Sequence, residues 1–70
     1  MEKEKDYYLD IYKRSKRTGR DLVNMEINEA VGFYLFTYPV DTKRVVLQDM
    51  QEGLISCTVG NAVAGILDII

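Results

Sequence analysis

Residues 54–70 of the chain read LISCTVGNAVAGILDII, and this stretch decides the expected fold. Its apolar residues recur at three- and four-residue intervals, which place side chains on one face of an α-helix. These positions are Val59, Ala62, Val63, Ile66, Leu67 and Ile70. Asp68 is the only charged residue of the stretch, so the helix is apolar around most of its circumference. Such a helix lies at the centre of a core or in an interface. We therefore expect residues 54–70 to be the most buried part of the molecule.

Two further helices are expected before this stretch, over about residues 3–17 and 21–38. The first has acidic residues ahead of basic ones, an order that the helix dipole favours, and Gly19 is its candidate stop. The second has a helical stripe of apolar residues and Asp21 as candidate N-cap. Pro39 ends it, because the residue before a proline avoids the helical conformation.

A short helix is expected over about residues 42–52, with Asp41 as candidate N-cap and Gly53 as candidate C-cap. The predicted fold is therefore all-α, a compact bundle of three or four short helices in one domain, residues 1–70. A competing interpretation is an α+β fold with a hairpin within residues 31–59. Residues 33–38 are rich in strand-forming side chains, and Gly32 could break a helix just before them.

The size of the chain limits how it can be stabilised. It has 70 residues, a single cysteine and no histidine, so an intrachain disulfide is impossible and a metal site is not expected. We expect the one thiol, Cys57, to pack in the core because its neighbours are mostly apolar. Hydrophobic residues make up 47% of the chain, which is more than one small core hides easily. A homo-oligomer is therefore predicted, most simply a twofold dimer.

The predicted interface lies on the charge-poor C-terminal stretch, where small residues would let a second helix approach closely. Its candidate residues are Val59, Gly60, Val63, Ala64, Ile66, Leu67 and Ile70. A membrane anchor is the less favoured interpretation, because a spanning helix needs about 20 mostly apolar residues and this stretch is shorter and contains Asn61 and Asp68. With a charged N-terminal segment and no disulfide framework, the expected location is the cytoplasm.

Five positive charges gather between residues 13 and 20 with no acidic residue among them. They belong to Lys13, Arg14, Lys16, Arg17 and Arg20. Guanidinium and ammonium groups pair strongly with phosphate oxygens, so the cluster is a candidate anion-binding site. The alternative is a solvated helix end whose charges interact with the helix dipole. The net charge of −2 argues against general nucleic-acid binding by the whole surface.

Catalysis is not expected. The chain lacks histidine for general-base chemistry, and residues 60–65 lack the lysine and spacing of a phosphate-binding loop. Asp49 and Glu52 share a possible helix face, where we expect them to be solvated. The predicted function is a non-enzymatic interaction or regulatory module that self-associates and binds a partner protein, without a cofactor. The alternative is a small binder of nucleotides or nucleic acid through residues 13–20.

Overall fold

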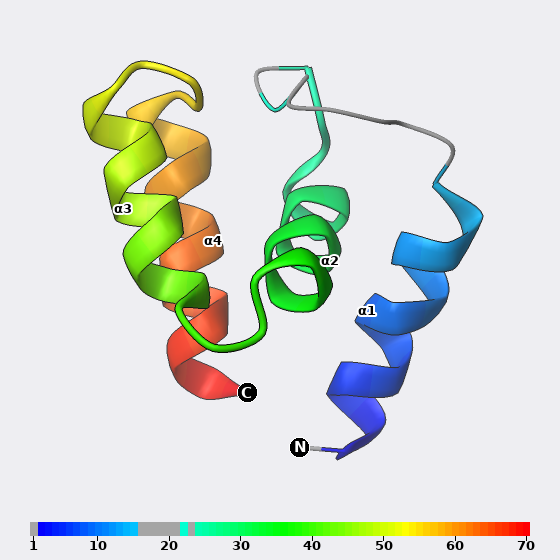
Figure 1. Cartoon of the computed structure of the whole chain (residues 1–70). Coiled ribbons are helices and arrows are strands. Elements are labelled where there is room, and N and C mark those ends of the chain that lie inside the picture. The colour runs from blue at the N-terminus through cyan, green and yellow to red at the C-terminus, as the bar shows by residue number, and fades with distance from the viewer. Residues whose placement is uncertain (1, 16–21, 23) are drawn as a thin grey trace.

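A computed structural model describes residues 2–15, 22 and 24–70 of the chain. Within these ranges it contains four α-helices and no strand (Figure 1). The helices are α1 (Glu2–Arg14), α2 (Ile27–Thr37), α3 (Thr42–Gln51) and α4 (Cys57–Ile69). The all-α prediction is confirmed. The hairpin alternative is wrong, because residues 33–37 continue α2 without a break at Gly32.

The second helix, not the fourth, is the centre of the bundle. In the described part of the chain α2 packs against α1, α3 and α4, whereas α4 packs against α2 and α3 only. Figure 1 shows α2 between α1 on one side and the α3–α4 pair on the other. The prediction that residues 54–70 are the most buried is therefore wrong. A helix with neighbours on two sides keeps one side open, however apolar its sequence is.

The expected start of the second helix needs correction. The second helix was expected from residue 21, but α2 begins at Ile27 and its N-cap is Glu26. The Glu29 side chain accepts a hydrogen bond from the Glu26 backbone N–H at 3.4 Å, which is half of a capping box. The candidate cap Asp21 and the candidate stop Gly19 lie outside the described residues. At its other end α2 stops at Thr37, two residues before Pro39, as predicted.

The turn between α3 and α4 follows the glycine rule. Gly53 has φ +76°, a conformation that only glycine adopts without strain. Its N–H donates to the Met50 carbonyl at 3.1 Å and the Leu54 N–H donates to the Asp49 carbonyl at 2.9 Å. These two bonds form a Schellman motif, in which Glu52 is the C-cap and Gly53 the left-handed residue just after it, so the predicted helix stop at Gly53 is confirmed.

The N-termini of α3 and α4 are capped in different ways. Asp41 occupies the predicted N-cap position of α3, but its side chain makes no capping hydrogen bond there. The Thr42 hydroxyl donates to the Tyr38 carbonyl, which links the start of α3 to the end of α2. The fourth helix begins at Cys57, later than the expected residue 54, because Ser56 is its N-cap. The Ser56 hydroxyl accepts a hydrogen bond from the Val59 N–H at 3.2 Å.

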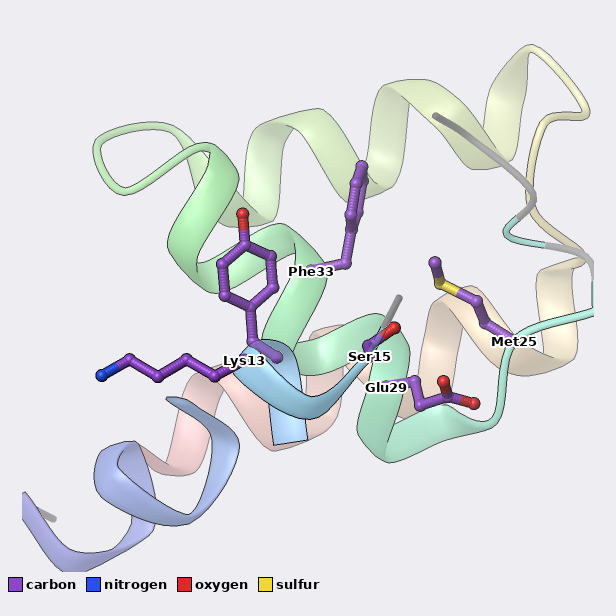
Figure 2. A pocket seen from close by; sticks show the side chains of 6 residues that line it. Lys13, Ser15, Met25, Glu29 and Phe33 are labelled. Carbon is purple, nitrogen blue, oxygen red and sulfur yellow. The ribbon is translucent and has the colours of Figure 1, made fainter. Parts of the chain in front are cut away.

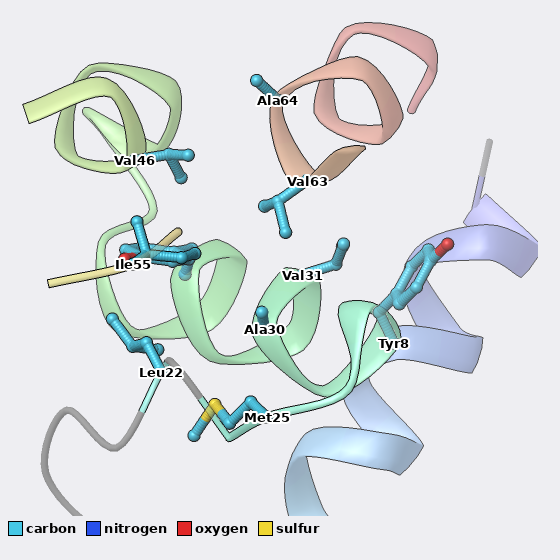
Figure 3. Packing of buried hydrophobic residues seen from close by; sticks show 10 residues of the cluster. Tyr8, Leu22, Met25, Ala30, Val31, Val46, Ile55, Val63 and Ala64 are labelled. Carbon is cyan, nitrogen blue, oxygen red and sulfur yellow. The ribbon is translucent and has the colours of Figure 1, made fainter. Parts of the chain in front are cut away.

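The described core runs through the whole bundle and joins all four helices (Figure 3). Its buried apolar members are Tyr8, Leu22, Met25, Ala30, Val31, Tyr34, Val46, Ile55, Val63 and Ala64. In Figure 3 Val63 of α4 points toward Val31 of α2, and Tyr8 of α1 lies on the other side of Val31. The central helix therefore supplies the surface on which α1 and α4 are both placed.

Glycines mark two close helix crossings. A Cβ atom on Gly32 would lie 2.9 Å from the Tyr8 carbonyl oxygen, so this glycine lets α1 approach α2. A Cβ atom on Gly60 would lie 2.3 Å from the Met50 Cγ, so this glycine lets α3 approach α4. Gly65 differs, since a Cβ atom there would meet nothing within 4 Å. The predicted close approach at Gly60 is thus made by a helix of the same chain.

We predict opposite effects for two glycine-to-alanine substitutions in α4. Gly60→Ala should lower the free energy of unfolding by about 1–3 kcal/mol, because Met50 must move to admit the new methyl group. Gly65→Ala should raise it by up to about 1 kcal/mol, because alanine is the better helix former and the site is open. Urea denaturation of both variants measures the difference. Equal effects of the two substitutions would contradict the crossing described above.

Candidate interaction surface

One side of α4 carries an uncharged apolar row that reaches the molecular surface. Val59, Ala62, Ile66 and Ile69 follow one another at intervals of three, four and three residues, so they lie along one helix face. We call these four residues the α4 open stripe. Val59, Ala62 and Ile66 are half-buried, and Ile69 is 69% exposed. A stripe of this spacing is the kind of surface that packs against another helix.

Two described helices, α2 and α3, pack against α4. The third helix reaches α4 at Gly60, against Met50, and at Asp68, whose carboxylate lies 2.6 Å from the Lys43 ammonium. The second helix reaches it at Val63 (Figure 3). Among the described helices the backbone of α1 does not come close to that of α4. Within the described residues, Val59 and Ile66 of the α4 open stripe pack against the core, and the exposed part of the stripe is its outer edge at Ile69.

The structure divides the predicted interface residues into three groups. Gly60, Val63 and Ala64 are buried within the chain. Leu67 and Ile70 are half-buried and packed against the core. The remaining two, Val59 and Ile66, are also half-buried and packed against the core, and they lie on the α4 open stripe. Sequence reasoning left Ala62 and Ile69 out of the interface, although their spacing from Val59 and Ile66 was the signal that could have found them.

Another exposed apolar side chain lies in a different setting. Leu47 on α3 is 46% exposed, and it lines a shallow surface groove with Arg44, Gln48, Gln51 and Glu52. The groove lining includes one residue of each charge, and Gln48 donates to the Glu52 carboxylate at 3.1 Å. Charged and amide groups that interact on the surface are well solvated. Leu47 is consequently a matched control for the α4 open stripe rather than a second candidate surface.

The structure describes two residues of the predicted basic cluster. Lys13 and Arg14 form the exposed end of α1, and Arg14 pairs with Asp10 one turn earlier at 2.9 Å. The other three members, Lys16, Arg17 and Arg20, lie outside the described residues. Anion binding by residues 13–20 therefore stays a prediction.

A cleft of about 290 Å³ lies between the C-terminal end of α1 and the start of α2 (Figure 2). It is lined by Tyr12, Lys13, Ser15, Met25, Glu29 and Phe33. Its charged groups have opposite sign, and in Figure 2 the Lys13 side chain extends away from the other lining residues. The described lining of the cleft is therefore not a concentrated positive site of the kind that phosphate binding needs.

A buried polar pair joins α2 to α3. The Tyr34 hydroxyl donates a hydrogen bond of 2.8 Å to Asp49 Oδ2, and Asp49 is only 2% exposed. The prediction that Asp49 is solvated is wrong. The position faces the central helix, and a buried carboxylate is tolerated when hydrogen-bond donors meet it. Sequence reasoning gave no reason to separate Asp49 from Glu52, which is exposed.

The prediction for the cysteine is also wrong. Cys57 is exposed, because it is the first residue of α4 and lies next to the N-cap Ser56 rather than on the face that meets the core. In the described ranges, no group of three or more residues with metal-binding side chains is gathered. No helix of the described part has the length and apolar character needed to cross a membrane.

Comparisons with known protein families, curated proteins and solved structures found no match to this chain.

We predict that Tyr34→Phe lowers the free energy of unfolding by about 1–3 kcal/mol, because Asp49 loses a donor in a buried place. Tyr7→Phe is the control. The Tyr7 hydroxyl accepts a hydrogen bond from Asn28 at the exposed surface, so its loss should cost no more than about 0.5 kcal/mol. Thermal unfolding of both variants provides the test. If the two substitutions cost the same, the buried bond does not have the role assigned to it.

Alkaline pH should destabilise the fold through Tyr8. Burial raises the pKa of Tyr8 above its ordinary value near 10, and Tyr7 and Glu4 raise it further. The folded state therefore favours the neutral phenol. The burial of the neutral Tyr8 phenol contributes its full stabilisation below the pKa that Tyr8 has in the unfolded chain, near 10. This stabilisation is lost as the pH rises through the raised pKa of Tyr8 in the folded state. Denaturation between pH 8 and pH 12 should show a smaller alkaline loss in Tyr8→Phe than in the parent, and an equal loss would refute the assignment.

Proposed function

We propose that this protein is a non-enzymatic interaction module that self-associates through the α4 open stripe. The observation that supports the proposal is the outer edge of this stripe, where the apolar side chain of Ile69 is 69% exposed beside the half-buried Ala62. Water contact with such a row is unfavourable, and burying it recovers about 25 cal/mol for each Å² of apolar surface. A second macromolecule is therefore expected to cover it.

A second copy is a reasonable partner for a chain of this size. A domain of 70 residues buries a modest fraction of its surface, and this one has no intrachain disulfide to stabilise it. Association adds apolar burial without adding residues. Most soluble oligomers are symmetric, and the twofold dimer is the commonest form. A module that acts by binding has a regulatory or structural role, and a single exposed cysteine fits a cytoplasmic location.

The basic cluster of residues 13–20 is a weaker candidate for the binding site than the α4 open stripe. Of its described members, Arg14 pairs with Asp10, and Lys13 borders a cleft that also holds the Glu29 carboxylate. These charges are partly balanced within the chain. No specific observation on the described residues favours phosphate binding over a solvated helix end.

Substitutions that place charges on the α4 open stripe should abolish association. We predict that Ala62→Lys with Ile69→Lys converts an oligomer to a monomer, because two ammonium groups would have to be buried in the contact. Leu47→Lys, which changes an exposed apolar residue on α3, should leave the mass unchanged. Sedimentation equilibrium up to about 100 μM gives the masses, since association depends on concentration by mass action. Circular dichroism checks that each variant is folded.

Two results would contradict the proposal. One is a monomer mass for the parent protein over the whole concentration range. The other is an oligomer that persists in the folded Ala62→Lys, Ile69→Lys variant, which would show that a different surface associates.

A further inference from the structure

We infer that α1 is a separately opening unit, which leaves α2 as a whole helix while α2, α3 and α4 stay folded. Its departure uncovers one face of α2. This inference does not depend on the self-association proposed above, because α1 lies on the side of α2 away from the α3–α4 pair (Figure 1). It follows from where the buried residues lie, from the neighbours of each helix and from the contacts that hold α1 in place.

Nearly all of the described core belongs to residues 22–70. Of its ten buried apolar residues, Tyr8 is the one that α1 supplies, and the other nine lie between Leu22 and Ala64. The buried hydrogen bond between Tyr34 and Asp49 joins α2 to α3 and does not involve α1. Opening of α1 therefore takes one buried side chain out of the core and leaves the packing among the other three helices in place.

The helices also differ in their neighbours. Within the described ranges α2, α3 and α4 each pack against both of the others, whereas the backbone of α1 comes close to that of α2 alone. A helix with one neighbour can leave without separating any other pair. Segments with few buried apolar side chains open at a lower free energy than the core does. We therefore expect α1 to open before the rest of the bundle unfolds.

The contacts of α1 follow one row along α2, where Asn28, Gly32 and Phe36 recur at intervals of four residues. The Asn28 side chain donates to the Tyr7 hydroxyl at 3.2 Å, and the Phe36 ring centre lies 5.9 Å from that of Tyr12. Tyr7 is 51% exposed and Tyr12 is 36% exposed, so water competes for both contacts. Between them, Gly32 admits the α1 backbone. This row becomes accessible when α1 leaves.

Hydrogen exchange of the whole chain tests the inference without any substitution. NMR follows the exchange of backbone amides in increasing, non-denaturing concentrations of urea. The hydrogen-bonded amides of α1 should share one opening free energy, with protection at least about tenfold below that of α3 and α4. Their exchange should also depend less on urea, because less surface is exposed than in global unfolding. Equal protection in all four helices, or low protection confined to the terminal turns of α1, would overturn the inference.

A pair of glycine-to-alanine variants provides the second test. In Gly32→Ala the new methyl group would lie 2.9 Å from the Tyr8 carbonyl oxygen, which cannot move aside unless α1 moves. Protection should be lost in α1 and stay within about threefold of the parent in α3 and α4. Gly65→Ala, at an open position, is the matched control. It should raise protection in α3 and α4 and leave α1 unchanged, because α4 stays folded when α1 opens.

Two outcomes of the variants would contradict the inference. One is the loss of protection in all four helices of Gly32→Ala, which would show that the bundle does not survive the departure of α1. The other is an equal rise of protection in α1, α3 and α4 of Gly65→Ala, which would show that α1 opens only when the whole chain unfolds.

Discussion

The hydrogen bond between Tyr34 and Asp49 fixes how the two halves of the bundle meet. Tyr34 is among the largest fully buried side chains, and it lies on the helix that contacts all the others. Its hydroxyl needs an acceptor in the interior, and Asp49 of α3 supplies one at 2.8 Å. A buried carboxylate is costly unless donors meet it, so the pair permits few relative positions of α2 and α3. The rotation of α3 about its own axis follows from this constraint.

The position of α4 depends on α3 in turn. The short Gly53 turn makes α3 and α4 neighbours, Met50 fills the space above Gly60, and Lys43 pairs with Asp68 at the far end of α4. These three contacts together with the Val63 side of the core leave the edge of α4 at Ile69 exposed. The first helix cannot cover this edge, because it is placed on the other side of α2 by the crossing at Gly32. The exposure of the α4 open stripe is therefore a consequence of the packing of α2 and α3.

Local signals predicted much of the fold. The stop before Pro39 and the turn at Gly53 were read correctly, because proline and glycine act on the backbone of their immediate neighbours. The start of α2 was predicted wrongly, because its N-cap is Glu26. Glutamate usually caps helices less well than aspartate, the residue type at position 21. Burial was predicted less well than helix formation. The polar residue Asp49 is inside and Cys57 is outside, and both depend on which helix is central, a property that no single stretch encodes.

The two glycines of α4 show why the candidate surface was only half predictable. Gly60 and Gly65 are equivalent in sequence terms, since each is a small residue in a charge-poor helix that would admit a neighbour. Met50 of the same chain occupies the space at Gly60, and no described atom occupies the space at Gly65. Periodicity identifies the apolar positions of a helix but not which of them its own chain will cover. That division depends on the crossing geometry of three helices. The spacing of Ala62 and Ile69 from Val59 and Ile66 marks them as positions on one apolar face, but it does not show that Ile69 is the exposed one.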